Sequence, residues 1–100
     1  MECERMFAVI FKAEIAQLDD EYSLTAARMR ELAINHYGCV EFSACCEGNQ
    51  EMAISYWPSQ DHITRWKQDS EHLAAQKKGR DKWYRRYQVQ VVEVLREYSH

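Results

Sequence analysis

The sequence has few of the residues that make linkers and no stretch that could cross a membrane. Its 100 residues include one proline and three glycines, which leaves no room for a flexible linker or a low-complexity tract. No apolar run is long enough to span a bilayer, and the acidic start, M-E-C-E-R, lacks the basic and apolar parts of a signal peptide. An apolar content of 46% is that of a folded chain. We therefore expect a single domain over residues 1–100, a cytoplasmic location and no membrane partner.

The sequence also lacks the spacings of a metal site. Its four cysteines are Cys3, Cys39, Cys45 and Cys46. None forms a C-x-x-C pair, and no histidines stand at zinc-finger spacing. Cys45 and Cys46 are adjacent in a predicted strand, so their side chains point to opposite faces and do not easily bridge each other. We expect no metal and four small buried hydrophobic residues, with a redox or metal role for the adjacent pair as the alternative.

Basic residues are scarce in the first half of the chain. Residues 1–50 carry nine acidic and four basic residues, and residues 51–100 carry seven and nine, so the net charge of −3 divides into −5 and +2. Most of the basic excess lies between Lys77 and Arg86, a run that is typical of a solvated helix face and could also bind an anion. Nucleic acid is not an expected partner, because an acidic protein repels a phosphate backbone.

The apolar pattern predicts four strands and three helices. Strands are expected at residues 6–14, 39–46, 51–57 and 87–98. Helices are expected after three capping positions, Asp19 or Asp20, Ser59 and Asp69. The third helix would carry Gln76, Arg80 and Tyr84 at helical spacing. The order β-α-β-β-α-β with a split second helix is a ferredoxin-like α+β fold.

Two features of these elements bear on packing. The strand at residues 6–14 and the segment 40–44 are apolar on both faces, so helices can cover one face and a second subunit has to cover the other. The last strand switches its apolar parity after Val91, which indicates a bulge. An apolar stripe on the first helix is expected to be core; its residues are Leu18, Tyr22, Ala26, Met29 and Ala33.

The segment from Ser55 to Tyr87 contains all three tryptophans and two of the four histidines, and we expect a cleft walled by it to be the site of function. His72 is the best candidate for a base or a ligand, because an imidazole titrates near neutrality. A structural role, capping a turn or bonding a neighbour, is its alternative. For Trp66 and Trp83, packing in the core is favoured over contact with a ligand, and a surface salt bridge is the more common role of a residue such as Arg80.

The same segment carries a family resemblance. Its pattern, together with the ending from Val91 to Tyr98, resembles the antibiotic biosynthesis monooxygenase (ABM) superfamily. The residues that carry the resemblance are Ser55-Tyr56-Trp57, Trp66, Glu71-His72-Leu73-Ala74-Ala75-Gln76, Gly79-Arg80 and Tyr84. The resemblance covers the chain from about Met6 to Tyr98. It implies a dimeric α+β barrel, a homodimer of two ferredoxin-like sheets packed face to face with a cavity in each subunit.

The resemblance does not assign this chain to either of two reactions known in the superfamily, because neither set of catalytic residues is complete here. In the branch that oxidises polyketides without a cofactor, Trp57 matches the tryptophan, whereas Ala53, Ile63 and Gln76 stand where the branch has asparagine, tyrosine and arginine. In the haem-degrading branch Trp66 matches the tryptophan. There Phe11 and Gln76 stand at the asparagine and histidine positions.

The leading hypothesis is a cofactor-independent monooxygenase of the ABM type acting on a small aromatic or quinone-forming substrate. Its catalytic residues would be His72 as base, Arg80 as a positive charge for an oxyanion, and Tyr84. The substrate would be held by Phe11, Trp57, Ile63, Trp66 and Gln76. One alternative is a protein that binds haem or another planar hydrophobic ligand without this activity. Another is a dimeric scaffold without catalytic residues.

Overall fold

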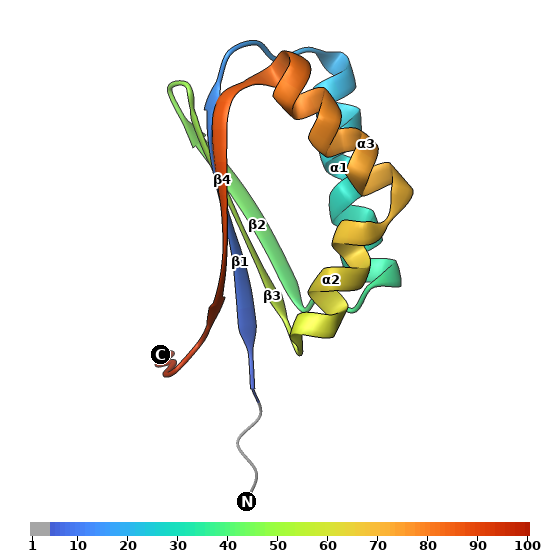
Figure 1. Ribbon diagram of the computed structural model, residues 1–100. Coiled ribbons are helices and arrows are strands. Elements are labelled where there is room, and N and C mark those ends of the chain that lie inside the picture. The colour runs from blue at the N-terminus through green and yellow to red at the C-terminus, as the bar shows by residue number, and fades with distance from the viewer. Residues whose placement is uncertain (1–4) are drawn as a thin grey trace, which may run out of the picture.

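A computed structural model describes residues 5–100 and confirms the predicted α+β, ferredoxin-like order (Figure 1). The elements are β1 (Phe7–Ile15), α1 (Asp20–His36), β2 (Glu41–Glu47), β3 (Gln50–Trp57), α2 (Gln60–Gln68), α3 (Ser70–Lys78), a short π-helix η1 (Gly79–Trp83) and β4 (Tyr84–Glu93). The strands pair antiparallel in the order β2-β3-β1-β4. Figure 1 shows all the helices on one side of the sheet. None of the helices formed by residues 5–100 is long and apolar enough to cross a membrane.

The helices begin where the capping residues predict. The side chain of Asp19 accepts a hydrogen bond from the backbone N–H of Tyr22 at 2.8 Å, and Asp69 accepts one from Glu71 at 2.8 Å. Ser59 caps α2 in the same way. Each cap satisfies one of the backbone donors that the first turn of a helix leaves without a partner.

The core lies between the sheet and the helices. It is formed by Phe7, Val9, Leu32, Ala33, Cys39, Trp57, Ile63 and Trp66. Trp57 is fully buried, and its indole N–H donates to the hydroxyl of Ser55 at 2.8 Å. Because an unpaired indole N–H would be costly in this environment, Ser55 is what allows the tryptophan to be buried there.

The predicted last strand was wrong at both ends. β4 begins at Tyr84, so Tyr84 is a strand residue rather than the end of the third helix, and it finishes at Glu93 rather than at Tyr98. The register against β1 is regular up to Glu93, and the irregularity lies at Glu14/Ile15. The parity switch has another cause: β4 is an edge strand on which the valines of both faces, Val91 and Val92, are exposed.

The prediction of buried cysteines was correct for one of those that the structure describes. Cys39 is buried in the core, whereas Cys45 and Cys46 are exposed free thiols on the edge strand β2. The prediction for Cys3 falls outside the described residues. Among residues 5–100 no cluster of three or more histidine, cysteine or acidic side chains could hold a metal ion.

Candidate functional site

A cavity of about 170 Å³ lies between the sheet and the helical layer. Its walls are apolar and rich in aromatic residues, which are Phe11, Tyr22, Phe42, Trp66, Trp83, Tyr84 and Tyr87. Three titratable residues of other types also line it, Glu51 from β3, Lys67 from α2 and His72 from α3. A mostly apolar pocket with a few convergent polar groups is the usual form of a small-molecule site.

The structure brings five of the eight sequence-predicted site residues together around this cavity. They are Phe11, Trp66, His72, Gln76 and Tyr84. Trp57 and Ile63 are buried in the adjoining core and are not among the lining residues. Arg80 is exposed on η1, lies outside the lining and takes part in none of the ion pairs formed within residues 5–100. The chain leaves α3 through a π-helix, so a position that helical spacing assigned to the cavity lies at the surface.

The stripe on α1 is only partly core. Tyr22, Ala26 and Met29 line the cavity, while Ala33 is fully buried in the core and Leu18 is 44% exposed. The apolar pattern of a helix is the same whether its face meets packed side chains or an internal space. The stripe therefore predicted the correct face but not the cavity.

Glu51 and Tyr84 form a hydrogen-bonded pair in the cavity wall. The phenol of Tyr84 donates to the Glu51 carboxylate at 3.1 Å. Burial raises the pKa of Glu51, against the opposing effect of this hydrogen bond. Burial, followed by the nearby negative charge, also raises the pKa of Tyr84, so the phenol stays protonated as the donor. The result is a carboxyl group that is more basic than usual, in a largely apolar space.

Glu51 was not among the sequence-predicted residues, although its strand contains the signal that would have found it. It has the same parity in β3 as Ala53, Ser55 and Trp57, so its side chain points to the helix-covered face. An acidic residue on the inner face of a strand is unusual and is a functional-site candidate.

η1 positions the aromatic wall beside this pair. Trp83, its last residue, is buried, and its indole N–H donates to Asp19 at 3.2 Å, which ties the π-helix to the start of α1. The next residue, Tyr84, packs its ring against Phe11 with a centroid distance of 5.4 Å. Short π-helical turns occur frequently at functional sites, because they turn side chains that a regular helix would point elsewhere.

His72 is mostly buried and packs edge-on against Trp66, with ring centroids 4.4 Å apart. Burial, and then the positive charge of Lys67, lowers the pKa of His72 from 6.5 to about 4. The expectation that this imidazole titrates near neutrality is therefore wrong, and the ring is neutral at pH 7. Its Nδ1 atom is buried and has no hydrogen-bond partner.

Comparison with known proteins places the chain in a family. No protein-family model matches it. The uncharacterized protein YqjZ of Bacillus subtilis (strain 168) is 38% identical over 92 residues, which cover 91% of this chain and 81% of YqjZ. The chain belongs to the same family as YqjZ.

Solved structures of proteins described as cofactor-independent oxygenases or antibiotic biosynthesis monooxygenases share the fold of this chain. SnoaB of Streptomyces nogalater, a cofactor-independent oxygenase, superposes in a mutant form with a TM-score of 0.77 at 15% identity, covering 98% of this chain and 100% of SnoaB. A candidate antibiotic biosynthesis monooxygenase from Caulobacter crescentus gives 0.74 at 12% identity, covering 93% of this chain and 92% of that protein. This relative of YqjZ therefore has the ABM fold.

Proposed function

We propose that the protein is a cofactor-independent monooxygenase that oxidises a small aromatic, quinone-forming substrate in the cavity. The observation that carries the proposal is the Glu51–Tyr84 pair, a carboxylate with a raised pKa in an apolar pocket rich in aromatic residues. The ABM fold supports it, because SnoaB shows that this fold can carry such chemistry. Fold alone does not give function, so the proposal depends on the residues of the site.

The size of the cavity indicates a substrate with one ring. A cavity of about 150 Å³ lined by apolar side chains binds benzene, and the cavity here measures about 170 Å³. A single ring with small substituents therefore fits without rearrangement. Trp66 and Tyr84 offer it flat apolar walls.

In the proposed reaction the Glu51 carboxylate accepts the phenolic proton of the substrate, while Tyr84 holds the carboxylate in place. The resulting phenolate transfers one electron to dioxygen, and recombination of the two radicals forms a carbon–oxygen bond at a ring carbon. The hydroperoxide that results loses water to give the quinone. One oxygen atom stays on the ring, and the other leaves as water with the phenolic and ring hydrogens. A base with a pKa raised toward neutrality suits the first step.

His72 and Tyr84 remain in this proposal as cavity residues, and Arg80 does not, because it is exposed and outside the lining. His72 is a weak proton acceptor at neutral pH as a consequence of its lowered pKa. We therefore assign the basic role to Glu51.

The test is oxygen uptake by the purified protein with a series of methoxyphenols and hydroxybenzoates of one ring, in the presence of a chelator and without added cofactor. We expect one quinone formed per oxygen consumed. Glu51→Gln keeps the size of the side chain and should lower the rate by about 100-fold or more. Glu47→Gln, on an exposed residue outside the cavity lining, is the matched control and should be fully active. No uptake above the buffer rate with any of these phenols, or an unimpaired Glu51→Gln, would show the proposal to be wrong.

Haem, the alternative ligand, is less well supported than a substrate with one ring. A porphyrin joins four pyrrole rings and would have to extend out of the cavity, whose volume of about 170 Å³ matches a single ring. The unpartnered nitrogen of His72 is the feature that favours haem, but this atom is enclosed by the same wall. Haemin titration checks this: we expect no Soret shift that depends on His72.

We also propose that the protein is a homodimer in which the uncovered faces of two sheets meet. The helices cover one face only (Figure 1). The opposite face carries Ile10, Ile54 and Tyr56, and Met52 and Val92 are 39% and 38% exposed there. An apolar face of this kind favours association over solvation.

A further inference from the structure

We propose that Lys67 and His72 form an anion subsite that holds the carboxylate of an aromatic acid in the cavity. This inference deepens the proposed function, because it names the substrate class of the same site. The inference requires only that an anion binds, whereas the proposed function also requires that the protein oxidises it.

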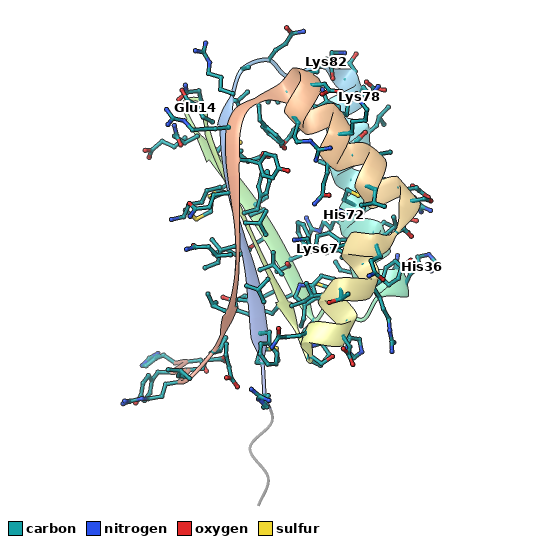
Figure 2. All side chains as sticks on the ribbon, in the orientation of Figure 1. Glu14, His36, Lys67, His72, Lys78 and Lys82 are labelled. Carbon is teal, nitrogen blue, oxygen red and sulfur yellow. The ribbon has the colours of Figure 1, made fainter. Side chains whose placement is uncertain are left out.

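The two residues come from neighbouring helices. Lys67 lies in the last turn of α2 and His72 in the first turn of α3, and both line the cavity (Figure 2). The short connection at Asp69 brings the two helix ends together. A ligand in the cavity thus meets a cation and an imidazole on the same side, the helical side.

Lys67 has no counter-ion within residues 5–100. Lysines elsewhere on the helical layer are paired, Lys77 with Asp81 at 2.6 Å and Lys78 with Glu21 at 3.1 Å, but no ion pair includes Lys67. Its side chain is half-buried against the apolar lining. A positive charge is costly in such a place unless an anion compensates it.

Asp69, the acidic residue two positions after Lys67 in the sequence, is already engaged. Asp69 accepts the hydroxyl of Tyr37 on one oxygen at 2.6 Å and the backbone N–H of Glu71 on the other at 2.8 Å. These bonds fix Asp69 as the cap of α3. No acidic side chain within residues 5–100 is thus paired with Lys67, and we infer that a ligand in the cavity supplies the anion.

His72 supplies the second, independent observation. Its Nδ1 is the one buried side-chain polar atom in residues 5–100 that has no hydrogen-bond partner. Buried polar atoms are nearly always paired, and an exception in a cavity wall marks a position that a ligand atom can fill. If the ring turns this nitrogen toward the cavity, an imidazole with its proton on Nδ1 would donate to a carboxylate oxygen that also faces Lys67.

The rest of the cavity defines the other part of the ligand. Trp66 provides an aromatic wall beside the subsite. On the sheet side, the Glu51–Tyr84 pair would repel a second anion but can bond a hydroxyl group. A hydroxylated aromatic acid of one ring, with its carboxylate at Lys67 and its hydroxyl toward Glu51, satisfies both polar sites.

The experiment compares the binding of benzoate with that of benzamide, a neutral molecule of the same shape, at pH 7. Because Trp66 and Trp83 line the cavity, tryptophan fluorescence reports binding, and calorimetry confirms it. We expect benzoate to bind about tenfold more tightly or better, as a charge-assisted hydrogen bond predicts. Lys67→Met should remove this preference, and His72→Phe should reduce it.

Lys77→Met is the matched control, because Lys77 is exposed, lies outside the cavity lining and is paired with Asp81. It should keep the full preference for benzoate. The inference is overturned if wild-type protein binds the two probes equally or does not bind benzoate at all. It is also overturned if Lys67→Met retains the preference. Failure of phenol oxidation with benzoate binding intact would defeat the proposed function only.

Discussion

The ring of Tyr84 lies directly against the α-carbon of Gly79. A Cβ atom at Gly79 would stand 2.9 Å from both Cδ2 and Cε2 of that ring, closer than side chains approach in proteins. Gly79 has ordinary helical backbone angles, so the glycine is required for space and not for conformation. The close approach places the phenol so that its hydroxyl reaches Glu51.

We predict that Gly79→Ala displaces the Tyr84 ring and destabilises the protein. Overpacking should cost about 1–2 kcal/mol, even though alanine is the better helix former. Urea unfolding measures the loss, and the benzoate affinity should fall with it, because the cavity wall moves.

Two comparisons make this test specific. Adding Tyr84→Ala removes the ring, so Gly79→Ala should no longer destabilise in that background. Gly48→Ala is the contrasting case: Gly48 has a φ of +60° and open space around it, so the cost there comes from backbone strain and leaves the cavity unchanged. A Gly79→Ala protein as stable as wild type would contradict the packing argument.

Glu51 should weaken the folded state at neutral pH. Its pKa is raised by burial, so the ionised carboxylate is less favourable in the folded protein than in the unfolded chain. We predict that Glu51→Gln is more stable than wild type at pH 7. The gain should vanish near pH 4, where the glutamic acid is protonated in both states. Thermal unfolding at the two pH values checks this, and a destabilised Glu51→Gln at pH 7 would indicate a structural carboxylate instead.

The neutral His72 should make stability fall in acid. Its pKa drops from 6.5 to about 4 on folding, so between these values the unfolded chain binds more protons and stability falls as the pH is lowered. From the size of the shift we expect a loss of about 2 kcal/mol between pH 7 and 4.5 that His72→Phe does not show. Other acidic groups titrate alike in both proteins, so the difference between their unfolding curves isolates His72. Parallel curves would refute the prediction.

Ser55→Ala should destabilise the core more than its size suggests. Ser55 is 2% exposed and is the acceptor for the indole N–H of fully buried Trp57. Removing the hydroxyl leaves that donor unpaired, at a cost of about 1–3 kcal/mol. Ser23→Ala, on an exposed serine of α1, is the control and should change stability by less than about 0.5 kcal/mol. Equal effects of the two changes would contradict this account.

The proposed dimer predicts that a charge on the uncovered sheet face separates the subunits. Ile54→Lys places an ammonium group in the middle of this face, where the partner sheet would desolvate it. Sedimentation should show wild type as a dimer at micromolar concentration and the variant as a monomer. A chain that is monomeric before any change would rule out the dimer.

Much of the fold follows from short-range rules, which is why the sequence predicted it. The caps at Asp19, Ser59 and Asp69 act within three residues of the helices they open, and the apolar pattern of short segments predicted the four strands. The predictions were wrong where the structure depends on a feature that short-range sequence rules do not detect. Helical spacing carried Tyr84 onto α3, because no sequence signal marked the π-helix that precedes it.

The sequence by itself determined the order of the elements and the caps of the helices, and it predicted five residues that line the cavity, Phe11, Trp66, His72, Gln76 and Tyr84. Only the tertiary structure decided the chemistry. The hydrogen bond from Tyr84 to Glu51 joins residues 33 positions apart, and it exists because β4 returns beside β1 and η1 turns the phenol inward. The lowered pKa of His72 depends on how much water the packed helices exclude. That Lys67 has no ion pair within residues 5–100 depends on which side chains the fold brings near it. Desolvation is a property of the assembled environment, and residue type alone does not set it.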